Sequence, residues 1–303
     1  MHRITRDQIV YSLDSGYDAA LAIDSGDRVV LETWDARSGT INSAADLLLQ
    51  PHPKGSNPAT GPIQVRGAEP GDGLAVHIEA IDLAPSGFLA VKKGQGLLAS
   101  RAQKFATRIV PIVDGIVHFG ELRFPARPMV GVIGTAPVGA GISTSYAGAH
   151  GGNMDNKHIS AGSTVYLPVA VAGAGLGLGD VHGAMGDGEI TFIGLEIQAE
   201  VTVRVDLHKG AGWQRPLIET PDYWVTTGDG ESLAAAARMA ANAMVDLLQS
   251  RLGLSFEDAY MLMSAAVDVQ ICQCCEPGAF PVTTRAVISK AILPQSGAWN
   301  ISG

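Results

Sequence analysis

The chain has 303 residues, enough for one large domain or two tightly packed subdomains with a sizeable core. Hydrophobic residues make up 46% of the sequence and charged residues 17%, which excludes a disordered chain. The net charge of −9, without any run of basic residues, argues against a nucleic-acid partner and favours a small neutral ligand.

Short segments with strand periodicity recur along the chain, separated by turn signals from 37 Gly and 16 Pro. Residues 29–31 form a short apolar strand, and residues 74–81 alternate apolar with polar side chains such as His77. Residues 166–171 indicate a more buried strand, and residues 201–207 repeat the alternation. Because no helices intervene, these segments predict antiparallel sheets in sandwich or barrel form.

A helical pair is predicted near residues 231–266. Apolar side chains recur there at helical spacing, at Leu233, Ala237, Ala240, Met244 and Leu247. Gly253 is a natural end for the first helix, and Ser255 with Asp258 resembles a capping box that begins the second. The fold class is therefore α+β, predominantly β, with antiparallel sandwich-like or barrel-like subdomains and a C-terminal helical pair.

A proline-rich stretch at residues 124–128 is the predicted subdomain boundary. We expect a β-rich N-terminal subdomain over residues 1–125 and a β-rich C-terminal subdomain with the helices over residues 126–303, packed as one unit. The apolar surface of the helical pair exceeds what one core needs, so a homo-oligomer is expected.

The predicted location is the cytoplasm. The first residues lack the apolar core of a signal peptide, and the longest apolar run, residues 166–179, is too short and too glycine-rich to span a bilayer. All three cysteines lie together, at Cys272, Cys274 and Cys275, which is no disulfide framework and indicates a reducing compartment. We interpret them as packing residues at the end of a helix or strand, with a redox role as the alternative.

Two glycine-rich clusters of polar residues are the candidate functional segments: residues 150–156 and residues 179–189. Glycine lets the backbone approach a ligand closely, and imidazole and carboxylate groups suit zinc and similar cations. Asp180 and His182 are two residues apart, so in an extended segment they face one side and can share one ion. The alternative is that Asp187-Gly188 forms only a hairpin turn.

Two other motifs are weaker. The glycine run at residues 173–179 resembles a dinucleotide-binding loop, but the glycines after it would break the helix that such a loop requires. Ser143 and Ser145 near His150 leave a metal-free serine hydrolase as an alternative, although no nucleophile-elbow motif is present.

These segments resemble the acetamidase/formamidase family. The resemblance is carried by Asn57-Pro58-Ala59-Thr60-Gly61-Pro62, by His150-Gly151-Gly152-Asn153-Met154-Asp155 and by the stretch from Gly179 to Glu189, and it extends from about Asp35 to Ile271. It implies a β-rich fold and an amidase that uses a divalent metal, with zinc as the expected ion, to convert a short linear amide such as formamide or acetamide to carboxylic acid and ammonia. A γ-lactam is the alternative substrate.

The expected metal ligands are His182 and Asp155, with His150 and Asp35 as further candidates. Glu189 is expected to act as general base and then general acid. Backbone N–H groups of Gly151 and Gly152 are the candidate oxyanion donors.

Asp187, like Asp180, is expected to orient the imidazole and the loop. Met185 departs from the family, which favours Gln at this position. The missing amide could have oriented the substrate or water, so the departure concerns the identity of the substrate. A non-catalytic β-sandwich that binds a small ligand is the third hypothesis, but aromatic residues that would form a stacking platform are only 6% of the chain.

Overall fold

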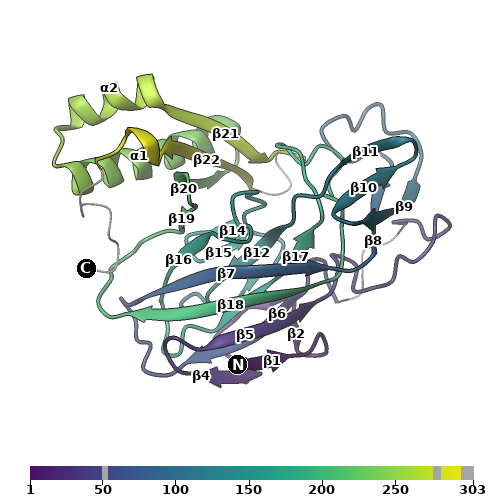
Figure 1. Ribbon diagram of the computed structural model, residues 1–303, viewed down its shortest axis with the longest axis horizontal. Helices are drawn as coiled ribbons and strands as arrows, with labels where there is room; N and C mark the ends of the chain where they lie inside the picture. Colours follow the sequence, from purple (N-terminus) through teal and green to yellow (C-terminus); the bar gives the residue numbers. More distant parts are fainter. Residues whose placement is uncertain (50–53, 276–280, 295–303) are drawn as a thin grey trace.

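The computed structural model describes residues 1–49, 54–275 and 281–294 (Figure 1). Its largest sheet has nine strands in the order β1-β5-β18-β7-β16-β19-β20-β22-β21. These strands are β1 (His2–Ile4), β5 (Arg28–Thr33), β18 (Ala199–His208), β7 (Gly73–Leu83), β16 (Thr164–Pro168), β19 (Leu217–Glu219), β20 (Tyr223–Gly230), β22 (Val282–Ser289) and β21 (Val267–Gln273).

A seven-stranded sheet lies against one part of the nine-stranded sheet. Its strands are β14 (Ala147–Gly148), β15 (Gly151–Asn153), β12 (Met129–Gly134), β17 (Leu176–His182), β6 (Ala59–Val65) and β2 (Ile9–Val10), with β4 (Leu21–Ile23) beside β6. Valine and isoleucine side chains from β5, β7 and β18 form one core with those of β6, β12 and β17. The two sheets are therefore packed as a sandwich.

Two smaller sheets complete the β structure. One contains β8 (Ser86–Val91), β9 (Ala106–Val113), β10 (Ile116–Phe119) and β11 (Leu122–Pro125), and the other pairs β3 (Ser12–Leu13) with β13 (Ile142–Ser143). The strand pairs are antiparallel except β1 with β5 and β4 with β6. The predicted class, mostly β with antiparallel sheets, is confirmed.

The alternation expected for residues 74–81 and 201–207 is confirmed by β7 and β18, which pair along nearly their full lengths. The glycine run at residues 173–179 leads directly into β17 and not into a helix. Strands from both sides of residue 125 are neighbours, since β18 lies between β5 and β7. Where a subdomain boundary falls stays a prediction.

The helical pair is also confirmed, as α1 (Leu233–Leu252) and α2 (Phe256–Ala266) at one end of the molecule (Figure 1). Gly253 ends α1 in the left-handed conformation, and the Ser255 side chain accepts a hydrogen bond from the Asp258 N–H at the start of α2. A 3₁₀ turn, η1 (Lys290–Ile292), follows β22.

The predicted apolar stripe of α1 is partly wrong. Leu233 is 41% exposed and Ala237 is not fully buried, whereas the buried residues are Ala236, Ala240, Met244, Val245 and Leu248. The physical reason is a close backbone contact with β20: a Cβ at Gly228 would lie 2.1 Å from the carbonyl oxygen of Ala236. That contact turns the neighbouring face of α1 toward the sheet. Among the described residues, no helix has the length and apolar character needed to cross a lipid bilayer.

Candidate active site

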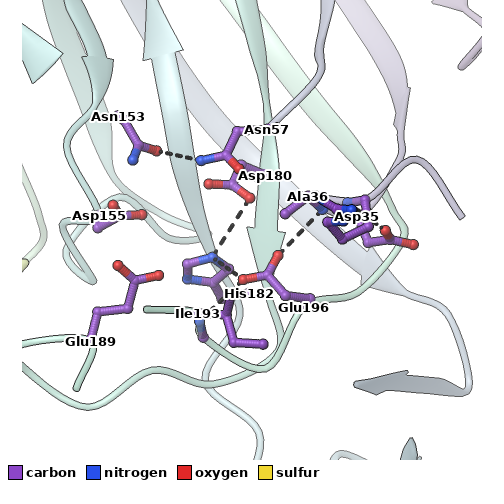
Figure 2. Close-up of polar contacts among 12 residues, drawn as sticks. Asp35, Ala36, Asn57, Asn153, Asp155, Asp180, His182, Glu189, Ile193 and Glu196 are labelled. Atoms are coloured by element: carbon purple, nitrogen blue, oxygen red, sulfur yellow. Dashed lines mark hydrogen bonds and ion pairs between the residues drawn. The ribbon is translucent and has the colours of Figure 1, made fainter. Parts of the chain in front are cut away.

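Five buried titratable side chains gather at the C-terminal end of β17, an interior strand of the seven-stranded sheet. They are Asp155, which follows β15, Asp180 and His182 of β17, and Glu189 and Glu196 in the segment after β17. Their exposed fractions lie between 0% and 6%. Ligand atoms of Asp155, Asp180 and His182 lie within 4.8 Å of one another, and so do those of His182, Glu189 and Glu196. Figure 2 shows the four carboxyl groups arranged around the imidazole.

His182 is the centre of this cluster because two carboxyl groups lie beside its Nε2: Asp180, on the same strand, and Glu196, in the segment after β17. Nε2 lies 3.1 Å from Oε1 of Glu196 and 3.8 Å from Oδ1 of Asp180. The sequence spacing predicted that Asp180 and His182 would face one site, and their ligand atoms are in fact close together. The other ring nitrogen faces Gly194, where a Cβ would lie 2.5 Å from Nδ1.

Gly131 of β12 lets the aspartates approach each other. A Cβ at this position would lie 2.7 Å from Oδ1 of Asp155 and 3.0 Å from Oδ2 of Asp180. Both distances are too short for a side chain, so only glycine leaves room for the two carboxylates.

The backbone of the cluster is also unusual. Asp155, Asp180 and Glu189 have φ angles of 45°, 54° and 46°, in the left-handed region that most non-glycine residues avoid. Such conformations cost about 1–3 kcal/mol each and persist where the surrounding structure enforces them, as at functional sites.

Burial dominates the electrostatics of the carboxyl groups. Burial raises the pKa of Glu189 to about 7 and that of Glu196 to about 8, and it raises the pKa of Asp155 well above its usual range. Burial alone would lower the pKa of His182, but Glu196 and Asp180 outweigh it and raise that pKa well above normal. The cluster therefore holds more acidic groups than its one imidazole can neutralise.

Four buried atoms of the cluster make no hydrogen bond among the described residues: Oδ1 of Asp155, Oδ1 of Asp180 and both ring nitrogens of His182, of which Nε2 is within ion-pair distance of Glu196 (3.1 Å). Unpaired buried polar atoms are costly and rare in folded proteins. Carboxylate oxygens and an imidazole nitrogen are the donors that divalent cations take from proteins, and a cation would supply the missing positive charge. The residues therefore fit a metal ion.

The loop that carries Glu189 is attached to the C-terminal strands. The Gly188 N–H donates to the Cys272 carbonyl (2.9 Å), and the Gly188 carbonyl accepts from the Cys274 N–H (3.1 Å). Nη2 of the fully buried Arg285 donates to both carboxylate oxygens of Asp187 (2.7 and 2.8 Å), and Lys157 makes a second ion pair with Asp187 (3.1 Å). Asp187 is thus both a turn residue and an anchor of the loop.

A cavity of about 230 Å³ opens beside the cluster. Its lining includes Asp180, Glu189, Glu196, Asn57 and Asn153. The Asn57 Nδ2 donates to the Asn153 Oδ1 at 3.2 Å, so two amide side chains stand next to the carboxylates (Figure 2).

Two of the predicted metal ligands lie outside the cluster. His150 is buried, and neither of its ring nitrogens has a hydrogen-bond partner among the described residues, so no Ser–His pair forms with Ser143 or Ser145. Asp35 closes its own turn by accepting from the N–H groups of Arg37 (2.8 Å) and Gly39 (3.2 Å). Figure 2 shows its carboxylate turned away from His182.

Gly151 and Gly152 lie in β15, between β12 and β14, and both have the positive φ angles that glycine permits (95° and 82°). They are not among the residues that line the cavity. Met185 lies half-buried in the loop before Glu189.

Sequence reasoning missed Glu196 and Gln273. Glu196 is in a stretch where apolar and polar residues alternate as in any strand, and Gln273 is in a segment that was interpreted only through its cysteines. All three cysteines are buried free thiols at or just after the end of β21, in agreement with the packing interpretation. Only the close approach of distant segments identifies either residue as part of the site.

The chain is similar to known proteins of one family. The model of the Acetamidase/Formamidase family matches residues 15–146 and 138–292. The crystal structure of a predicted acetamidase/formamidase from Thermoanaerobacter tengcongensis is 38% identical with a TM-score of 0.92, and the match covers 96% of each chain. The acetamidase of Bacillus halodurans is also 38% identical, with a TM-score of 0.91 over 95% of this chain and 97% of that one.

Among curated sequences, the acetamidase of Mycolicibacterium smegmatis is 31% identical over 269 residues, which is 66% of this chain and 63% of that protein. The chain thus spans somewhat less than two thirds of that relative's length. The family model, in contrast, covers nearly the whole chain. The chain belongs to the acetamidase/formamidase family.

Proposed function

We propose that this chain hydrolyses a short linear amide, of the formamide or acetamide type, to the carboxylic acid and ammonia. The observation that carries the proposal is the set of four buried atoms without a hydrogen bond among the described residues, on Asp155, Asp180 and His182, next to a cavity. Membership of a family with relatives named acetamidase supports the reaction class.

The proposed ligands of a divalent cation, zinc by preference, are His182, Asp155 and Asp180, with Glu196 as a fourth candidate. A cation bound there would supply Lewis acidity for the amide carbonyl and lower the pKa of water. His150 and Asp35, proposed as ligands from sequence alone, are less well supported because neither belongs to the two groups of close ligand atoms.

Glu189 is the proposed general base and acid. Its carboxyl group lines the cavity, and its pKa of about 7 suits a group that takes a proton from water and returns it to the departing amine at neutral pH. Asn57 and Asn153 offer amide donors and acceptors that can orient an amide substrate. Because Asn153 lines the cavity, we prefer it to Gly151 and Gly152 as the oxyanion donor.

A cyclic amide is the second candidate substrate. The cavity of about 230 Å³ has room for more than a four-atom amide and its water, because a single water needs only about 10–15 Å³ by the same measure. A cytoplasmic location and a homo-oligomeric state stay predictions.

The experiment measures ammonia release from formamide and acetamide and ring opening of a γ-lactam, before chelation, after chelation and after zinc is added back. We expect release that chelation abolishes and zinc restores. In parallel, Glu189→Gln should lose turnover by at least about 100-fold and keep its metal, as expected for loss of a general base. Chelator-insensitive release would overturn the metal proposal, and full activity of the variant would remove Glu189 from the reaction.

A further inference from the structure

We infer that Gln273 is a positioning residue of the active site: its side-chain amide joins the Asp155 and Glu189 carboxylates, and by holding one oxygen of each it leaves the other oxygen of Asp155 for the cation and that of Glu189 for proton transfer. The Gln273 Nε2 lies 2.9 Å from Oδ2 of Asp155 and 3.2 Å from Oε2 of Glu189. This inference rests on the proposed function, because it concerns the same cluster.

The chemistry of an amide group suits this position. Ionised carboxylates only accept hydrogen bonds, so the NH₂ end of the Gln273 amide must face them, and its two hydrogens match the two acceptors. The amide is neutral, so unlike Lys or Arg it would not replace the positive charge of a cation. Gln273 therefore links two like-charged groups without competing with the metal.

The link also sorts the oxygens of Asp155. Its Oδ2 accepts from Gln273, and its Oδ1 is the atom left buried without a partner among the described residues. Gln273 thus occupies one oxygen and leaves the other for the cation. Glu189 is held in the same way through Oε2, with a weaker second contact from the Cys275 thiol at 3.7 Å.

The backbone around Gln273 is built to aim this side chain. The register between β21 and β22 shifts between Ile271 and Gln273, so Cys272 is an extra residue on the β21 side of a bulge. A bulge changes the direction of the side chains that follow it, and bulges are frequent beside active sites. The Gln273 N–H donates to the Thr283 hydroxyl (3.0 Å), and Gly188 pairs with Gln273 as a short parallel bridge.

Gln273 is therefore held from three directions, and its side chain is only 8% exposed. Its partners lie 118 and 84 residues earlier in the chain, on two segments that the ion pair of Lys157 with Asp187 also joins. A residue with only a packing role would not need both amide hydrogens directed at carboxylates.

The test compares Gln273→Met, which keeps the length of the side chain and removes its donors, with Gln273→Glu and with the wild type. The matched control is Gln214→Met, the same substitution at an exposed residue whose amide donates to the Gly212 carbonyl in its own turn. Zinc affinity is measured by titration of the apoprotein, independently of any substrate, and kcat and KM are then measured at saturating zinc.

We expect Gln273→Met to lose zinc affinity by about 10–100-fold, as is usual when a group that orients a ligand is removed. At saturating zinc, kcat should fall while KM for the amide changes little, because Gln273 acts through Glu189. Gln273→Glu should also lose turnover, since it adds a carboxylate to a crowded cluster, and Gln214→Met should match the wild type.

Wild-type zinc affinity and kcat in Gln273→Met would overturn the inference, and so would a variant that loses only thermal stability. If the wild type itself binds no metal and hydrolyses no amide, the proposed function has failed. If the wild type binds zinc and the Gln273 variants bind it equally well, only the role of Gln273 has failed.

Discussion

At the scale of single residues, the cluster depends on its acids and also on neighbouring glycines that have no side chain. Gly131 and Gly194 each stand where a Cβ would press on a cluster atom, at 2.7 Å from Asp155 and 2.5 Å from His182. Three of the five acid or imidazole positions also have a left-handed backbone. The acids are common residue types, but the space that brings them together is specific.

Gly131→Ala should therefore damage the site without unfolding the chain. The added methyl group must displace the Asp155 or Asp180 carboxylate, so we expect zinc affinity to fall by about 10-fold or more, with activity falling in parallel. Metal titration and circular dichroism measure the two effects. The control is Gly186→Ala, because a Cβ there meets nothing within 4 Å. Equal zinc affinity in both variants would contradict the crowding argument.

His150 makes a prediction about pH. Burial lowers its pKa to about 4, below the value of about 6.5 expected in the unfolded chain, so the unfolded state binds more protons between these two values. Stability is therefore greatest above pH 6.5 and falls as pH drops toward 4, by about 3 kcal/mol at most from this group.

Urea denaturation at pH 7 and pH 4.5 measures the effect of His150. His150→Gln should lower stability at pH 7 but reduce the difference between the two pH values. An unchanged difference would show that His150 does not remain neutral in the folded protein.

At the scale of elements, the loop after β17 is held by β22 and β21, the last two strands at one edge of the nine-stranded sheet. Arg285 of β22 is fully buried, and Asp187 is its carboxylate partner, while Gly188 is paired with the end of β21. This arrangement gives the C-terminal strands a part in the site, beside that of the seven-stranded sheet.

Asp187→Asn should weaken that anchor. It leaves the buried Arg285 without a charged partner, and after discounting for the partial exposure of Asp187 we expect a loss of about 1–3 kcal/mol of unfolding free energy. Lys157→Met, which removes the more exposed cation, should cost under about 1 kcal/mol. Chemical denaturation compares the two, and equal losses would contradict the assignment of Arg285 as the main partner.

Local pattern was sufficient to predict several elements and insufficient for others. Strands β7 and β18 follow from alternation, and both helix boundaries at Gly253 and Ser255 follow from capping chemistry. The buried stripe of α1 was misjudged because a glycine on another element, Gly228, decides which face packs. Periodicity within one segment carries no information about such a contact.

The site shows the same limit. Asp180 and His182 could be paired from their spacing, since both lie on one strand, and Asp155 and Glu189 were found from their glycine-rich surroundings. Glu196 and Gln273 reach the cluster only through the packing of distant segments. Conversely, His150 is in the same sequence motif as Asp155, and Asp35 follows a predicted strand, but neither side chain belongs to the groups of close ligand atoms.

At the scale of the whole molecule, the fold brings together segments that are far apart in the sequence. The acids lie just after β15, on β17 and in the segment that follows β17, whereas Gln273 and Arg285 lie on β21 and β22, after both helices. The molecule is in this sense a single functional unit: neither the seven-stranded sheet nor the C-terminal strands contain the cluster and its supports alone.

The late position of β21 has a consequence for biosynthesis. While the ribosome is still making the helices, the nascent chain already carries all five acid and imidazole residues but not the amide that joins Asp155 to Glu189. N-terminal parts of a chain begin to fold during synthesis, so any early contact among these residues is made without that link. A ribosome that stops between α1 and β21 would release a chain with the acids of the site and without the residue that orders them.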